Sequence, residues 1–380
     1  MRILYVIDKM TNLAGIERIL SCKMNYLSEN MNHQVVLATY AQQGLPLAFP
    51  LNEKIIYRSF NTPMPQREGY SFSSWFRAHL NARKAFKCKF KSILIDVRPD
   101  IVIFTGYAYP ILDIIIHTCR KLNIKTIMES HIKSDTVSMS RYVYNRTLHR
   151  IFSFWDARII KSLRVCNCIV TLTHEDMAFW SQYGNRIEVI PNMITIIPQS
   201  VVDYKAKRII AAGRYVYQKG YDLLLEAWHL IDNRFVDWHL YVYGNENKEP
   251  YQQIVDKYGM NKNVHLLPAT EKIVEQFSKS SIYVMSSRFE GFPLVLGEAM
   301  SCGLPCVSFD CPHGPRDIIS NEEDGLLVEN GNVEQLARSL ERLMADSSLR
   351  QAMGKRASIN IMRYSPPKIM EKWDWLFRNI

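Results

Sequence analysis

Short runs of β-branched residues alternate with longer helical patterns along the whole chain. This alternation is typical of α/β domains with parallel sheets. In the first half we expect strands at 2–7, 34–39, 101–105, 124–129, 168–172 and 186–190, and helices at 15–30, 75–96, 110–122, 142–165 and 174–182. In the second half we expect strands at 208–212, 238–243, 263–267, 281–285, 305–309 and 325–328, and helices near 220–232, 249–259, 270–279, 293–302, 315–320 and 332–345.

The pattern is interrupted once, between Pro191 and Tyr204, by two prolines and a polar stretch. We therefore predict one Rossmann-like domain over residues 1–191 and a second over residues 192–365, facing each other. The last segment, 366–380, begins at two consecutive prolines and carries regularly spaced aromatic residues. We expect this segment to pack back across the first domain.

Composition sets further bounds. The chain has 380 residues, 47% of them hydrophobic, which is enough for two or three cores. No stretch approaches the roughly 18–20 apolar residues of a membrane span, and the start suits a buried strand better than a signal peptide. We therefore expect a cytoplasmic protein. Its eight cysteines are scattered and lack the spacing of a zinc site, so we expect no metal.

Positive charge is concentrated in the first half. Residues 1–191 hold 25 Lys and Arg against 14 Asp and Glu, whereas the remainder holds 22 against 23. Such asymmetry favours an anionic surface or polymer as partner. A solvated basic face without a partner is the alternative.

The string EGFPLVLGE, at 290–298, places two carboxylates eight positions apart around a helix start. Pro293 suits the first helical position, so Glu290 would precede the helix and Glu298 would lie inside it. At 1.5 Å per residue the two lie on the order of 10 Å apart. This spacing is wide for a glycosidase pair and suits the two ends of an elongated ligand. A salt bridge of Glu298 to a neighbouring cation is the alternative.

Arg214 and Lys219 stand five positions apart in a polar loop after the strand at 208–212. Two cations on a short loop can clamp a diphosphate and neutralise the charge that develops as it leaves. Ligands of open α/β sheets bind at the carboxyl ends of strands, which favours this function over two solvated loop cations.

Two further candidates follow strands of the first half. Gly15 opens a helix after the first strand, and a helix start is a natural anion site. His131 follows the strand at 124–129, where it could hydrogen-bond a sugar or phosphate oxygen. A plain helix start and a structural histidine are the alternatives.

Two basic stretches are interleaved with aromatic residues. Residues 57–91 contain eight Lys and Arg and one Glu among eight aromatic residues, and residues 141–164 repeat the theme. Cations attract anionic headgroups and aromatic side chains seat at the membrane interface. Nucleic-acid binding, or a helix whose aromatic residues are simply core, are the alternatives.

Taken together, these motifs resemble glycosyltransferase family 4, whose members have the GT-B fold of two Rossmann-like domains across a cleft. The resemblance covers nearly the whole chain and is strongest from Ile209 to Val328. It rests on the E-x7-E element at 290–298, the Arg214/Lys219 pair followed by GYDLLLEAW, and the runs FDCPHGPRDII and EDGLLV. These last runs resemble the branch that acts on lipid-linked glycans.

The resemblance implies a retaining, metal-independent hexosyltransferase that uses a UDP-sugar as co-substrate, needs no other cofactor and acts in cell-surface polysaccharide biosynthesis. Arg214 and Lys219 would hold the diphosphate, and Glu298 the ribose hydroxyls. The transferred sugar would be held by Glu290, Gly291, Phe292, Pro293 and Leu294. Gly15 would reach phosphate and His131 would reach the sugar.

The resemblance also implies a glycan or polyprenyl-linked acceptor, bound at a membrane surface by the basic first domain. We expect no nucleic-acid partner, and peripheral association with the inner face of the cell membrane. Two other functions stay open at this point. A UDP-sugar epimerase or hydrolase of similar architecture would turn over its donor without acceptor. A basic membrane- or nucleic-acid-binding adaptor would not need Lys219 or Glu298.

Overall fold

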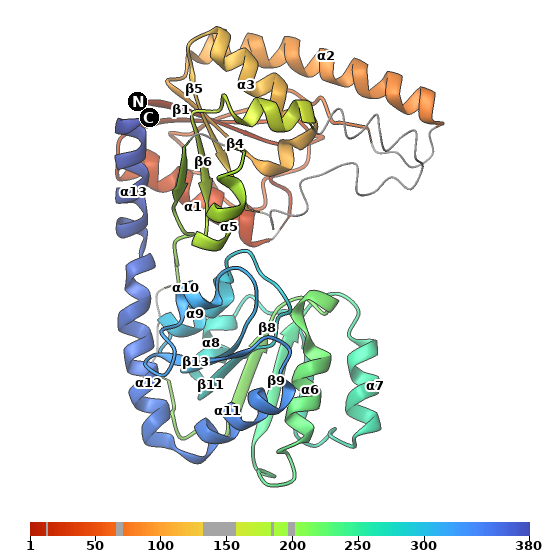
Figure 1. Ribbon diagram of the computed structural model, residues 1–380, viewed down its shortest axis with the longest axis vertical. Coiled ribbons are helices and arrows are strands. Elements are labelled where there is room, and N and C mark those ends of the chain that lie inside the picture. The colour runs from red at the N-terminus through yellow and green to blue at the C-terminus, as the bar shows by residue number, and fades with distance from the viewer. Residues whose placement is uncertain (13, 66–70, 132–156, 184–185, 197–201) are drawn as a thin grey trace. The chain divides into compact units, whose positions relative to one another are not determined.

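The computed structural model describes residues 1–12, 14–65, 71–131, 157–183, 186–196 and 202–380. The chain divides into two compact units, Met1–Pro191 with Ile369–Ile380, and Asn192–Lys368 (Figure 1). The break falls at the boundary that the sequence predicts, and the end of the chain groups with the first unit. The predicted helix at 142–165 lies outside the described residues up to 156, and residues 157–163 are helical.

The first unit is built on a seven-stranded parallel sheet with the order β3-β2-β1-β4-β5-β6-β7. Its strands are β1 (Arg2–Ile7), β2 (Gln34–Thr39), β3 (Ile56–Ser59), β4 (Ile101–Thr105), β5 (Lys125–Glu129), β6 (Cys168–Thr171) and β7 (Ile187–Val189). Strands β1, β2, β4, β5 and β6 are almost wholly buried, as expected for a sheet covered on both faces.

Helices cover both faces of this sheet. Alternate strand residues such as Leu4 and Val102 pack with α2 (Phe72–Val97) and α3 (Leu112–Lys121). The opposite face carries α1 (Gly15–Glu29) and α13 (Pro366–Asn379), whose side chains meet between Lys23 and Trp373. The short helix α5 (His174–Trp180) follows β6, and a 3₁₀ turn, η1 (Gly106–Ile111), precedes α3.

The second unit has a six-stranded parallel sheet with the order β10-β9-β8-β11-β12-β13. Its strands are β8 (Arg208–Ala212), β9 (His239–Gly244), β10 (Val264–Pro268), β11 (Ile282–Met285), β12 (Cys306–Asp310) and β13 (Gly325–Glu329). One face packs against α6 (Tyr221–His229), α7 (Glu249–Lys257) and α11 (Val333–Ala345) (Figure 1). On the other side lie α8 (Ile273–Ser278), α9 (Leu294–Ser301) and α12 (Ser347–Asn360).

The remaining short elements of this unit are η4 (Tyr217–Lys219), α10 (Pro315–Ile318) and η5 (Ile361–Tyr364). The prediction of two parallel α/β domains is confirmed, but two elements are absent from it. Strand β3 is exposed along its length because it is the edge strand, so it carries no burial pattern to recognise. Helix α12 buries small and polar residues, including Gly354 and Arg350, and therefore lacks an apolar stripe.

Candidate active site

Two loops of the second unit meet at the carboxyl ends of neighbouring strands. Strand β8 pairs with β11, and each is followed by a loop that carries a predicted site residue. Across these loops Lys219 Nζ lies 2.7 Å from Glu290 Oε1. The structure thus joins a cation and a carboxylate that the sequence assigns to different parts of the ligand.

Glu290 is held firmly. Glu290 is 7% exposed. Ser287 Oγ donates to the same Oε1 at 2.6 Å, and the Glu290 backbone N–H donates to Pro312 O at 3.1 Å. Among the described residues, Oε2 of this carboxylate has no hydrogen-bond partner. One oxygen is therefore fixed by the protein and the other can accept from a ligand hydroxyl.

The lysine loop is tied to the glutamate loop along its length. Ser286 Oγ donates to Lys219 O at 2.9 Å, Gln218 Nε2 donates to Phe289 O at 3.0 Å, and Arg288 N donates to Gln218 O at 2.8 Å. These bonds fix the Lys219 backbone before any ligand arrives, which is what preorganised charge stabilisation requires.

Gly220 ends this loop with φ +60°, a conformation that favours glycine. A Cβ here would also overlap the carbonyl oxygen of Ser286. The position therefore needs glycine for two independent reasons.

Arg214 lies in the same loop with its side chain exposed. Among the described residues its guanidinium forms no ion pair. The loop around it is anchored to the end of β9, because Gly213 N donates to Tyr243 O at 2.9 Å and Tyr215 N donates to Asn245 O at 2.8 Å. Arg214 is thus a free cation on a fixed backbone.

The E-x7-E element folds as the sequence predicts in outline. Helix α9 begins at Leu294, and Pro293 is its N-cap rather than its first helical residue. Glu298 lies inside α9 and is 3% exposed. Phe292 is buried edge-on against Tyr364, with ring centroids 5.4 Å apart, whereas Gly291 and Leu294 are half-buried. The first N–H groups of α9 lack helical partners and can donate hydrogen bonds to ligand oxygens.

In the first unit, His131 lies two residues beyond the end of β5 and is 9% exposed. His131 Nε2 lies 3.0 Å from Glu129 Oε2, and the ammonium group of Lys23 forms an ion pair with Glu129 Oε1. Burial alone would raise the pKa of Glu129, but Lys23 and His131 outweigh it and hold the pKa at about 2. The carboxylate is therefore ionised at neutral pH.

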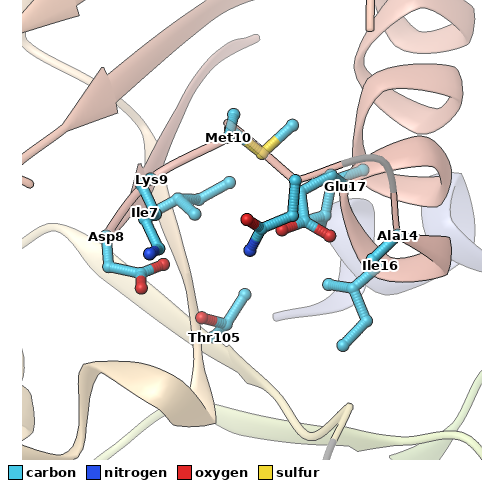
Figure 2. Close-up of a pocket in the computed structure, with 10 residues that line it drawn as sticks. Ile7, Asp8, Lys9, Met10, Ala14, Ile16, Glu17 and Thr105 are labelled. Atoms are coloured by element: carbon cyan, nitrogen blue, oxygen red, sulfur yellow. The ribbon is translucent and has the colours of Figure 1, made fainter. Parts of the chain in front are cut away.

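A pocket of about 320 Å³ lies at the carboxyl ends of β1 and β4, beside the first turn of α1 (Figure 2). Figure 2 shows Asp8, Glu17 and Thr105 around it, with Lys9 on the β1 side. Burial raises the pKa of Asp8, and Thr105 Oγ1 has no hydrogen-bond partner among the described residues. Two carboxylates against one ammonium suit ligand hydroxyls better than a phosphate.

Gly15 is the first residue of α1, next to this pocket, and Ala14 provides no capping side chain. The uncapped N–H groups could donate hydrogen bonds to an anion. Glu17, in the same first turn, opposes one by its negative charge. The phosphate role of Gly15 stays a prediction.

A basic hollow of about 340 Å³ lies over α2 and α3. Its lining includes the exposed Lys84, Lys87 and Lys121, together with Arg83, His117 and Arg158. Its one carboxylate, Asp113, accepts two hydrogen bonds from Arg83, at 2.7 and 2.8 Å. The hollow is therefore strongly positive.

Four aromatic residues of the 57–91 stretch lie in the core, not on the membrane-facing surface that the membrane hypothesis gives them. Phe60, Trp75, Phe86 and Phe90 are all buried in the first unit. The alternative of an aromatic core is therefore correct for these four, whereas Tyr57 is exposed and Phe76 is half-buried. The second stretch lies largely outside the described residues. In the described part of the chain, no helix is both long and apolar enough to cross a bilayer.

Sequence reasoning missed the side chains that support the site. Ser287 on Glu290, and Lys23 and Glu129 behind His131, were not singled out. Ser286 and Ser287 directly follow a buried strand, which is a usable signal for site residues. Lys23 lies in the middle of a helix, and nothing in its local sequence marks it as buried.

The chain matches two families along its length. Residues 14–196 match the family described as Glycosyltransferase Family 4, and residues 193–359 match Glycosyl transferases group 1. An uncharacterized glycosyltransferase of Haemophilus influenzae is 30% identical over 59% of this chain and 67% of its own length. The amylovoran biosynthesis glycosyltransferase AmsD of Erwinia amylovora is 24% identical over 98% of both chains.

Solved structures agree on the fold. HepE from Anabaena, solved in complex with UDP, superposes with a TM-score of 0.71 and 13% identity over 100% of both chains. Identity this low shows the fold alone, which is GT-B as the sequence predicts. With its two family matches and its Haemophilus relative, the chain belongs to the glycosyltransferases of family 4.

Proposed function

We propose that this glycosyltransferase moves a hexose or an N-acetylhexosamine from a UDP-sugar to a glycan or lipid-linked acceptor in cell-surface polysaccharide biosynthesis. The observation that carries the proposal is the Lys219–Glu290 pair at the carboxyl ends of β8 and β11. It sets a cation for a leaving diphosphate beside a carboxylate for sugar hydroxyls. The amylovoran glycosyltransferase and the UDP complex of HepE support the acceptor class and the nucleotide.

Lys219 can serve both groups at once. An ammonium has three donors, and Glu290 occupies one of them. A second can reach a phosphate oxygen, to which Arg214 adds an exposed guanidinium. Negative charge grows on the diphosphate as the sugar leaves, so fixed cations stabilise the transition state more than the bound donor.

We assign the hydroxyl contacts to the carboxylates. Glu290 Oε2 accepts from the transferred sugar, and the backbone of residues 291–294 lines the same end of α9. Glu298, buried inside α9, accepts from the two ribose hydroxyls. In the first unit, His131 contacts a sugar hydroxyl and the pocket around Asp8 and Glu17 takes a hydroxyl-rich ring.

We propose transfer with retention and without a metal ion. The bond from the anomeric carbon to the phosphate oxygen breaks, and the acceptor oxygen bonds to the same face. The acceptor proton passes to the departing phosphate oxygen, so charge and atoms balance. A glycosyl group trapped covalently on any side chain would refute this step.

We also propose that the protein works in the cytoplasm at an anionic membrane surface. The basic hollow supports this, because Lys84, Lys87 and Lys121 are exposed cations in one place. Juxtaposed lysines attract anionic headgroups without aromatic insertion.

A thermal-shift screen of nucleotides and nucleotide sugars tests the donor, because a ligand of the folded state raises the melting temperature. UDP and UDP-sugars should give the largest shifts, and a preference for another nucleotide would contradict the proposal. Incubation with the preferred donor then separates the functions. Turnover without acceptor would indicate an epimerase or hydrolase, and no nucleotide binding at all would indicate an adaptor.

A further inference from the structure

Three ionisable side chains lie in a buried row inside the first unit. Lys23 of α1, Glu129 of β5 and His131 are 2%, 2% and 9% exposed, respectively. The Lys23 ammonium pairs with Glu129 Oε1, and His131 Nε2 lies 3.0 Å from Glu129 Oε2. Both carboxylate oxygens are thus engaged, one by each partner.

Removing charged groups from water costs free energy, so this buried row of side chains is costly to place in the core. Burial lowers the pKa of Lys23, although Glu129 opposes that shift. The ring of Trp373, from α13, lies 4.2 Å from Lys23 Nζ, and the buried Tyr5 ring faces the same ammonium at 5.4 Å. Trp373 and Tyr5 exclude water from the pair.

The ionised Glu129 decides which nitrogen of His131 carries the proton. A carboxylate only accepts, so Nε2 must donate to it. In the neutral ring Nδ1 is then left as an acceptor. That atom is buried and has no hydrogen-bond partner among the described residues.

We propose that Glu129, held by Lys23, is a positioning residue that fixes the His131 ring so that Nδ1 accepts a hydrogen bond from a hydroxyl of the carbohydrate substrate. The substrate rests on the proposed function, whereas the fixed ring does not depend on it. Glu129 itself touches no ligand and acts only through His131.

The first test reads the ring directly. In protein with ¹⁵N-labelled histidine, the His131 signal is identified by its loss in His131→Asn and should report one neutral tautomer, with the proton on Nε2. Glu129→Gln alone leaves Lys23 buried without its partner and can unfold the chain. The working variant is therefore Lys23→Met with Glu129→Gln, which removes both charges.

In this double variant the amide can donate or accept, so His131 should show a mixture of tautomers. Its kcat/KM should fall about 10- to 100-fold with an unchanged melting temperature, the size expected for one misdirected buried hydrogen bond. The control is Arg186→Met with Glu188→Gln, which removes a half-buried ion pair in the same unit and should change neither reading.

The proposal is overturned if wild-type His131 carries its proton on Nδ1, or if the double variant keeps a pure Nε2–H tautomer and wild-type kinetics. A tautomer change without any turnover of nucleotide sugar in the wild type would refute the proposed function and leave the positioning role standing.

Discussion

Lys219 Nζ and Glu290 Oε1 lie 2.7 Å apart although 71 residues separate them in the chain. The contact exists because β8 and β11 are neighbours in the sheet and their following loops leave from the same edge. Each loop alone offers one charged residue. Their pairing makes one site with a donor and an acceptor side by side.

Replacing Lys219 by Met should lower kcat/KM about 10²- to 10³-fold, the usual loss for one preorganised group that stabilises transition-state charge. It should also weaken UDP binding, measured by calorimetry. Lys207→Met is the matched control, since Lys207 pairs with Asp237 on the surface of the same unit, with both side chains more than half exposed. Equal kinetics in the two variants would remove Lys219 from the site.

Gly220→Ala should destabilise the protein more than Gly259→Ala. Both glycines have positive φ, +60° and +68°, so each alanine bears a conformational cost of about 1–2 kcal/mol. Only at Gly220 does the new Cβ meet backbone, at the Ser286 carbonyl, whereas nothing lies within 4 Å at Gly259. Urea unfolding gives the difference, and equal losses would show that the 219–220 backbone is not held against Ser286.

Stability should depend on Glu129 in acid. Its pKa is held at about 2 in the folded protein against an ordinary 4.5, so the unfolded chain takes up the proton first as pH falls. The stabilisation is complete above pH 4.5 and is lost between 4.5 and 2, on the order of 3 kcal/mol in all. Urea unfolding from pH 6 to 3 should show a steeper decline in the wild type than in the Lys23→Met, Glu129→Gln variant. Parallel curves would contradict this.

Charge reversal in the basic hollow should release the protein from anionic membranes. Changing Lys84, Lys87 and Lys121 to Glu should lower binding to phosphatidylglycerol vesicles about 100-fold or more at low salt, since each lysine contributes about 1 kcal/mol. Flotation at low and high salt measures it. Reversing the exposed Lys262, Lys279 and Lys355 of the second unit is the control. A similar loss in both would mean that total charge, and not the hollow, governs binding.

The sequence by itself determined the fold class, the boundary near Pro191 and the strand ends at which Arg214, Lys219, His131 and Glu290 stand. This was possible because buried parallel strands and the turns after them leave local signals: β-branched runs, helix starts and polar residues at fixed positions. Where burial leaves no local pattern, as along the exposed β3 or the polar α12, the sequence was silent.

Only the tertiary structure decided which of these residues touch. The pairing of Lys219 with Glu290 depends on strand order, and the burial of Lys23 depends on Glu129 and Trp373, 106 and 350 positions further along the chain. It also placed Phe60, Trp75, Phe86 and Phe90 in the core, where the membrane hypothesis would put them at a lipid surface. Partners that are distant in sequence leave no mark on local composition, so their contacts appear only once the sheet has set its strand order.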